Sequence, residues 1–179
     1  MKISLITPAK KRSKDGNRTT ALRWARILRD LGHRVDISVD YQGKRTDLMI
    51  ALHAWRSAAS ISKYREIYPD GPLIVSLTGT DINEFIHSDP TPTLASMENA
   101  DALVCLHDLV IDITPKRFRK KLHVIYQSAP TLTQKRHPAT KFFDICQIGH
   151  MREVKDPLRG ALALRDLPES SCLRLIHLG

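Results

Sequence analysis

Short apolar segments alternate along the chain with longer segments in which apolar residues recur at helical spacing. Within residues 1–129, six apolar segments have the length of strands, and helical or polar segments separate them. Consecutive parallel strands need a long crossover, usually a helix, so this alternation predicts an α/β fold with a doubly wound parallel sheet. The strands are expected at residues 2–7, 34–40, 47–53, 73–77, 102–106 and 123–126.

The first connection has the clearest helical pattern. Leucine or alanine recurs there at positions 22, 25, 28 and 31, which is the spacing of one helix face. Gly32 follows directly and is expected to end this helix, because glycine readily adopts the left-handed conformation at helix C-termini. Further helices are expected over residues 54–68 and 93–99.

The pattern changes after Tyr126. Residues 130–141 are polar, include Pro130 and Pro138, and show no periodicity, which predicts a linker. A strand at 142–148, a helix at 156–165 and a strand at 173–178 then form one expected βαβ unit. Such a unit cannot bury both faces of its own sheet, so we expect residues 142–179 to begin a second doubly wound domain whose remainder is not in this chain.

Charge indicates the kind of partner without naming it. The chain has 28 Lys and Arg against 19 Asp and Glu, a net charge of +9, which suits nucleic acid, a membrane surface or phosphorylated small molecules. The basic cluster at 116–121 has Phe118 as its one aromatic residue, so a solvated turn is favoured over a nucleic-acid surface. We therefore expect no nucleic-acid partner.

Cysteine usage and hydropathy indicate the compartment. Cys105, Cys146 and Cys172 are far apart, odd in number and set in apolar segments, so buried, reduced thiols are expected. The apolar N-terminal stretch is too short for a signal peptide, and no segment approaches the about 20 apolar residues of a membrane helix. The sequence predicts a soluble, cytoplasmic protein without a transmembrane segment.

Several common site motifs do not occur in the sequence. There is no Gly-x-Gly-x-x-Gly after the first strand, no P-loop and no zinc-ligand spacing, so we expect no cofactor and no metal.

Ligands of open α/β sheets bind at the carboxyl ends of the strands, so the residues that follow each strand are the candidates. Their Gly, Thr, Asn and Arg content suits phosphate or sugar hydroxyls, although Asp81 is equally compatible with a helix cap and Arg18 with a surface charge. The candidates are Gly16, Asn17, Arg18, His53, Thr78, Gly79, Thr80, Asp81, His107, Asp108, Gln127, Ser128 and residues 149–155.

Five segments in order resemble those of family 4 glycosyltransferases, which have the two-domain GT-B fold. "LRWARILRDLGHRVDI" is similar to the family's first helix and second strand, and "VSLTGTDI" to its His-Gly-Thr-Asp loop. "NADALVCLHDLV" and "VIYQSA" resemble its Ala-Asp-x-x-x-x-x-Ser and Val-Ile-x-Asn-Gly segments. "QIGHMREVKDP" resembles the Val-Gly-Arg-x-x-x-x-Lys stretch that opens the second domain. The resemblance covers nearly the whole chain.

The resemblance implies a Rossmann-like acceptor-side domain over residues 1–129 and the start of a nucleotide-sugar-binding domain over residues 142–179. It implies that the acceptor is bound by Gly16, Asn17, Arg18, Thr78, Gly79, Thr80 and Asp81. It implies that the donor is bound by Gly149, His150, Arg152 and Lys155.

The chain departs from the family pattern at three positions. Thr78 stands at the usual loop histidine, His107 at the serine, and His150 at the arginine that meets the donor diphosphate, which leaves Arg152 as a substitute. Family members also carry two glutamates eight residues apart later in the second domain, and the glutamates here form no such pair. We therefore expect an incomplete donor site and no turnover by this chain alone.

Within the family, the chain is most similar to a narrower group, the selenosugar synthases of selenoneine biosynthesis. Three segments show this: "RTTALRWARILRDLGHRV", "ALHAWRSA" and "GHMREVKDP". That resemblance implies a reaction that joins selenophosphate to the sugar of UDP-N-acetylglucosamine and releases UDP. Two alternatives stay open: a family 4 transferase with a sugar or lipid-linked hydroxyl acceptor, and a truncated, non-catalytic α/β binding domain. The acceptor itself and the anomeric outcome do not follow from the sequence.

Overall fold

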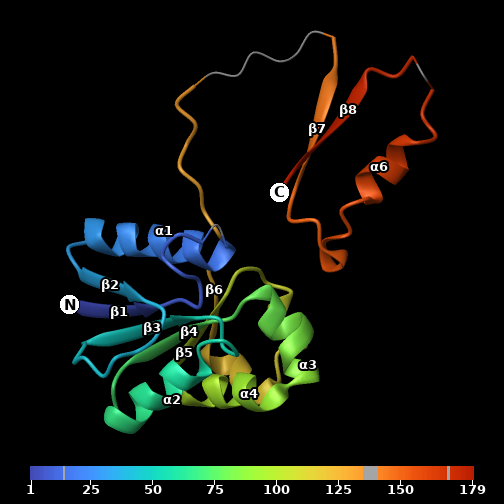
Figure 1. Ribbon diagram of the computed structural model, residues 1–179. Coiled ribbons are helices and arrows are strands. Elements are labelled where there is room, and N and C mark those ends of the chain that lie inside the picture. Colours follow the sequence, from blue (N-terminus) through green and yellow to red (C-terminus); the bar gives the residue numbers. More distant parts are fainter. Residues whose placement is uncertain (14, 135–140, 169) are drawn as a thin grey trace. The chain divides into compact units, whose positions relative to one another are not determined.

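The computed structural model describes residues 1–13, 15–134, 141–168 and 170–179. The chain divides into two units, residues 1–128 and 129–179 (Figure 1), and each is described by itself. Residues 135–140 of the predicted linker lie outside the described residues.

The first unit is built on a six-stranded sheet in the order β2-β1-β3-β4-β5-β6, and every pair of neighbours is parallel. This confirms the predicted fold class, and a strand is present in each of the six predicted segments. The order reverses between β1 and β3, which is the switch point at which open α/β sheets bind ligands. The strands are β1 (Lys2–Ile6), β2 (Arg34–Ser38), β3 (Leu48–Leu52), β4 (Leu73–Ser76), β5 (Ala102–Cys105) and β6 (Leu122–Val124).

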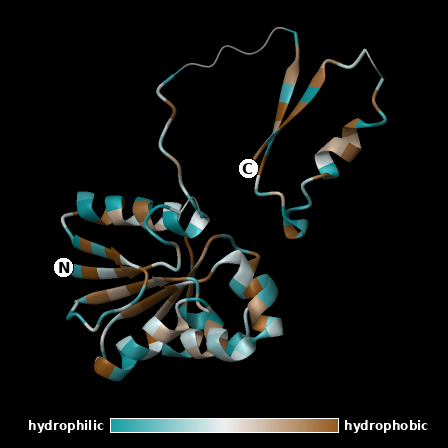
Figure 2. Cartoon of the chain, in the orientation of Figure 1, coloured by the Kyte–Doolittle hydropathy of each residue, from teal (hydrophilic) through white to brown (hydrophobic). Residues whose placement is uncertain are grey.

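Helices cover both faces of this sheet (Figure 1). Alternation along β3 shows the two faces: Ile50 and Leu52 pack on the side of α1 (Gly16–Asp30), whereas Met49 and Ala51 pack on the side of α2 (Ala58–Ile67) and α4 (Pro90–Asn99). Each face has its own apolar cluster. The helices carry hydrophobic and hydrophilic residues side by side (Figure 2), as expected where one side of each helix meets the sheet.

Shorter helical segments follow β4 and β5. A π-helix, η1 (Asp81–Phe85), leads directly into α3 (Ile86–Ser88). After β5 come α5 (Val110–Ile113) and the 3₁₀ segment η2 (Lys116–Lys121). The loops after both strands are therefore short and structured.

The helix α1 is present as predicted, but its buried stripe differs from the apolar series that predicted it. Leu22 and Leu31 are 48% and 68% exposed. Ala25 of that series is buried as predicted, together with Ala21, and these small residues let the helix lie close to the sheet. Gly32 ends the helix as predicted, with φ of 87° and its N–H donating to the carbonyl of Arg29 at 2.9 Å.

The second unit contains the predicted βαβ arrangement. Strands β7 (Phe143–Ile148) and β8 (Leu173–Leu178) are parallel, and the 3₁₀ turn η3 (Glu153–Lys155) and the helix α6 (Arg159–Leu164) connect them. The prediction that all three cysteines are buried is wrong, because Cys105 is buried but Cys146 and Cys172 are exposed. Apolar side chains on the strands of this unit stay in contact with solvent: Phe143, Ile148 and Leu178 are 68%, 80% and 50% exposed.

Candidate functional site

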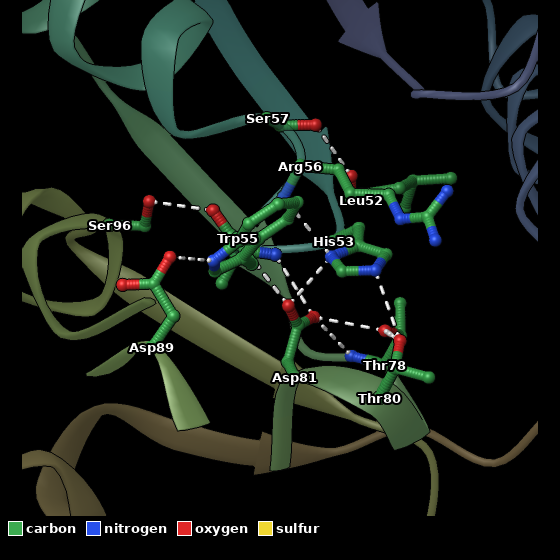
Figure 3. A network of polar contacts seen from close by, with 11 residues as sticks. Leu52, His53, Trp55, Arg56, Ser57, Thr78, Thr80, Asp81, Asp89 and Ser96 are labelled. Carbon is green, nitrogen blue, oxygen red and sulfur yellow. Dashed lines mark hydrogen bonds and ion pairs between the residues drawn. The ribbon is translucent and has the colours of Figure 1, made fainter. Parts of the chain in front are cut away.

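The loops that follow β1, β3, β4 and β5 all leave the sheet at its carboxyl edge, because these strands are parallel. Strands β3 and β4 are neighbours, and adjacent strands lie about 5 Å apart, so the residues that follow them are within contact distance. Figure 3 shows the network of polar contacts formed there, which joins the turn after β3 to the 78–81 loop after β4.

His53 directly follows β3 and is the centre of this network. Its side chain is 2% exposed, and its φ of 74° is left-handed, a conformation that costs a non-glycine residue about 1–3 kcal/mol. Two backbone bonds hold this geometry: the His53 N–H donates to the Ser76 carbonyl at 2.9 Å, and the His53 carbonyl accepts the Ser57 N–H at 3.0 Å.

Asp81 is fully buried and pairs with His53, whose Nδ1 lies 2.7 Å from Oδ1. The backbone N–H groups of Ala54 and Trp55 donate to the carboxylate at 3.0 and 2.9 Å. Thr78 adds its backbone N–H at 2.8 Å and its hydroxyl at 3.0 Å. Both carboxylate oxygens are therefore engaged by protein donors from two loops.

The balance of these effects keeps Asp81 ionised. Burial raises the pKa of its carboxyl, but the hydrogen bond and charge of His53, with the N–H groups of Trp55 and Thr78, outweigh burial and lower this pKa below its ordinary value. An ionised carboxylate only accepts, so Nδ1 of His53 carries the proton that faces Asp81. A protonated Nδ1 has no lone pair, so the Arg56 N–H, 3.3 Å away, does not donate to it.

The other imidazole nitrogen faces Thr80. Nε2 of His53 lies 3.0 Å from the Thr80 hydroxyl oxygen, and Thr80 is half-buried. The order hydroxyl, imidazole, carboxylate is the order of a nucleophilic triad. However, the imidazole is only 2% exposed, which leaves Nε2 little access to a substrate. The arrangement is therefore best suited to fixing the 78–81 loop.

An aromatic pair lies beside this network. The rings of Trp55 and Phe85 stack with centroids 4.3 Å apart and planes at 10°, and Nε1 of Trp55 donates to Asp89 at 2.9 Å. Sequence reasoning missed this pair and the partnership of His53 with Asp81. His53 and Asp81 were both recognised as strand-end residues, but their pairing depends on which strands are neighbours.

Four of the acceptor residues expected from the resemblance are consecutive in the sequence and form the loop after β4. Thr78, Gly79, Thr80 and Asp81 are contiguous with the network, and the Asp81 carboxylate faces protein donors. Gly79 is exposed, and Thr78 is half-buried.

The other three expected acceptor residues form the first turn of α1. Asn17 accepts a 3.3 Å hydrogen bond from the Thr7 hydroxyl at its carbonyl, and Nε of Arg18 is buried without a partner among the described residues. Among those residues, no hydrogen bond links Gly16, Asn17 or Arg18 to the 78–81 loop, although both loops lie at the carboxyl edge. Strand β3 and His53 stand between them.

The expected donor residues lie in the second unit, after β7. Gly149 is half-buried, whereas His150, Arg152 and Lys155 are exposed. Asp156, which follows η3, is left-handed with φ of 46°. Across the described ranges, no group of three or more His, Cys, Asp and Glu side chains is arranged to hold a metal ion.

No protein-family model matches the chain, and no curated protein matches it. None of the helices in the described ranges is both long and apolar enough to cross a membrane.

Proposed function

We propose that the chain belongs to a GT-B glycosyltransferase of family 4 and supplies its acceptor-side domain. The observation that supports this most is positional. Segments 75–82, 99–110 and 124–129, which resemble family motifs in the family's order, run out of neighbouring strands at the carboxyl edge. Ligands of open α/β sheets bind at that edge.

The proposed reaction is that of a selenosugar synthase. The selenium of selenophosphate forms a bond to the anomeric carbon of N-acetylglucosamine, the bond from that carbon to the UDP oxygen breaks, and UDP leaves with the electron pair. An alcohol acceptor needs a base to take its proton, whereas selenophosphate is already an anionic nucleophile.

The chemistry of the carboxyl edge favours such a nucleophile. His53 and Asp81 are buried, and the polar atoms of both side chains are engaged by protein groups, so neither is free to take a proton from an acceptor hydroxyl. An acceptor that arrives ionised needs no base, and positive groups are then what the site must supply.

The first turn of α1 supplies such groups in the proposal. The first N–H groups of a helix have no intrahelical partner, and its N-terminus favours anions. Among the described residues, the first turn of α1 contains no acidic side chain, and Asp15 before it makes no side-chain cap. Gly16 and Asn17 then offer backbone N–H groups, and the Arg18 guanidinium grips two phosphate oxygens.

The donor side of the proposal uses Gly149, His150, Arg152 and Lys155, which meet the diphosphate of UDP-N-acetylglucosamine. Charge-assisted hydrogen bonds to phosphate are about twice as strong as neutral ones, so the two basic side chains carry most of this contact. The cysteines are free thiols, which suits a reducing cytoplasm as the location.

Calorimetric titration of the chain with selenophosphate tests the acceptor half. UDP release from UDP-N-acetylglucosamine, in a version with a complete second domain, tests the reaction. We expect release to require selenophosphate and to fall roughly tenfold or more in Arg18→Ala, because a lost charged hydrogen bond to phosphate costs at least that much. Arg26→Ala is the matched control, since its side chain lies on the same helix and is 78% exposed.

Three results would contradict the proposal or redirect it. Release that only a hydroxyl acceptor drives would indicate an ordinary family 4 transferase. Selenophosphate binding without any turnover would indicate a non-catalytic binding domain. An Arg18→Ala protein as active as the parent would remove the helix N-terminus from the acceptor site.

A further inference from the structure

A cavity of about 180 Å³ lies between the loops that follow β4 and β5. Apolar side chains form most of its lining: Leu77 and Ile82 from the β4 side, and Leu106, Val110 and Ile113 from the β5 side. Leu77, Ile82 and Val110 are buried, whereas Ile113 is 47% exposed at the mouth. The cavity therefore has an apolar interior and an opening to solvent.

Polar groups stand at the opening. Asn83 and His107 also line the cavity, and both residues are exposed. The Asn83 amide nitrogen lies 3.8 Å from the position that a Cβ on Gly79 would take, so it stands over the exposed backbone of the 78–81 loop. Among the described residues, neither the Asn83 amide nor the His107 imidazole has a hydrogen-bond partner within the protein, so both are free to bond a ligand.

The β4 wall of the cavity is held in place by the His53 and Asp81 network. Asp81 accepts the Thr78 N–H at 2.8 Å and its hydroxyl at 3.0 Å, and the Thr78 carbonyl receives the Ile82 N–H at 3.4 Å. These bonds hold the loop on which Thr78, Gly79 and Ile82 line the cavity.

Backbone hydrogen bonds fix the floor and the β5 wall. Leu77 donates to the Val104 carbonyl at 2.8 Å, which joins the floor to β5. The Thr114 hydroxyl donates to the Val110 carbonyl at 2.7 Å. The cavity is thus preformed, so ligand binding costs little free energy for ordering the loops around it.

The volume of the cavity and its apolar lining limit which ligands it can hold. A dry, apolar protein cavity of about 150 Å³ holds benzene, so this cavity has room for one six-membered ring or a branched chain of similar volume. A second cavity, of about 80 Å³ beside Tyr41 and Thr46, is too small for the same group. Small-molecule sites typically combine such an apolar interior with a few polar groups at fixed positions.

We propose that this cavity binds a small amphiphile, with a single ring or branched apolar group between Ile82 and Val110 and a hydrogen-bonding head at Asn83 and His107. Thr78 and Gly79 line this cavity and are also acceptor residues of the glycosyltransferase proposal, so the two sites adjoin. The test contains neither nucleotide sugar nor selenophosphate, so its failure and the failure of the proposed function are distinguishable.

The test uses the whole chain and 4-fluorophenol, which has one ring and one hydroxyl. We expect saturable changes in its fluorine NMR signal below about 10 mM, the range of small fragments. Amide shifts of the protein should concentrate in residues 77–83 and 106–113. No saturation, or shifts centred elsewhere, would overturn the proposal without any variant being needed.

Two variants sharpen the result. Ile113→Trp fills the mouth of the cavity and should weaken binding roughly tenfold or more, while Leu109→Trp, at a 66% exposed position outside the lining, should not change it. Asn83→Ala should weaken binding of 4-fluorophenol but not of fluorobenzene, which has no head group. Equal binding by the parent and Ile113→Trp would place the probe outside the cavity and overturn the proposal.

Discussion

Oδ1 of Asp81 lies 2.7 Å from Nδ1 of His53, and both side chains are buried. His53 follows β3 and Asp81 follows β4, so this contact ties together two loops of neighbouring strands (Figure 3). The same carboxylate also satisfies N–H groups at the start of the turn before α2. One buried pair therefore organises the centre of the carboxyl edge.

Asp81→Asn should destabilise the first unit by about 2–4 kcal/mol, because breaking one partner of a buried pair leaves the other groups unsatisfied. An asparagine has nearly the same volume, so the loss reports on charge and hydrogen bonding and not on packing. Urea unfolding followed by circular dichroism measures the change in the free energy of unfolding.

Asp89→Asn is the matched control for this substitution. Asp89 also accepts a hydrogen bond from Trp55, but it is exposed, so its loss should cost less than about 1 kcal/mol. Equal changes in the free energy of unfolding for the two substitutions would show that the buried pair of Asp81 and His53 contributes no more to stability than the exposed Asp89.

The contribution of Asp81 to the free energy of unfolding should decrease as the pH falls. Its pKa in the folded chain is lowered from the ordinary value of 3.8, so the folded state binds its proton less readily than the unfolded state does. The contribution is complete above that ordinary value and is lost as the pH falls through the lower, folded pKa. The difference in unfolding free energy between the parent and Asp81→Asn should thus shrink below about pH 4. A difference that grows on acidification would contradict this.

The stability of His53 variants should depend on the backbone conformation that the new residue allows at this position, as well as on the loss of the imidazole. Its φ of 74° suits Asn better than β-branched residues, for which the left-handed region is strongly unfavourable. His53→Val should therefore cost about 1–3 kcal/mol more than His53→Asn, since both lose the imidazole but only valine adds backbone strain. Chemical unfolding of the two variants measures the order, and equal stability would refute the argument.

Much of the fold was predictable because strands and helices have different hydrophobic periods. Every predicted strand is present, but the helix expected from residue 54 begins only at Ala58. Residues 53–57 form the turn that encloses the Asp81 carboxylate, a tertiary contact that no local pattern reveals. The π-helix at 81–85 was likewise missed, because nothing in its residues distinguishes it from a loop or α-helix.

The positions of the site residues were predictable from the sequence, but the contacts between their side chains were not. Thr78, Gly79, Thr80 and His53 all follow strands, and the rule for open α/β sheets selects them. The hydrogen bond between His53 and Thr80 depends on β3 and β4 being neighbours, and strand order is a property of the whole sheet. The left-handed backbone of His53 gave no signal either, since such positions are usually marked by glycine.

Strands β7 and β8 should exchange their amide hydrogens faster than β1, β3 and β4. A two-stranded sheet is marginally stable, and apolar side chains remain uncovered in this unit, with Phe143 and Ile148 68% and 80% exposed. Deuterium exchange read by mass spectrometry compares the two units within one sample. Protection through Leu178 equal to that of β3 would show that the second unit is as stable as the first.

Lys155→Ala and Arg152→Ala should each raise the donor KM or lower kcat by roughly tenfold or more in a version with a complete second domain. Both side chains are exposed at the turn after β7, and the segment resembles the diphosphate-binding stretch of the family. Arg159→Ala is the control, since that guanidinium is also exposed but pairs with Asp156. Steady-state UDP release at varied UDP-N-acetylglucosamine separates the two kinetic constants. Because a solvated loop charge would leave both constants unchanged, parent-like kinetics in Lys155→Ala and Arg152→Ala would remove this turn from the donor site and leave the acceptor proposal standing.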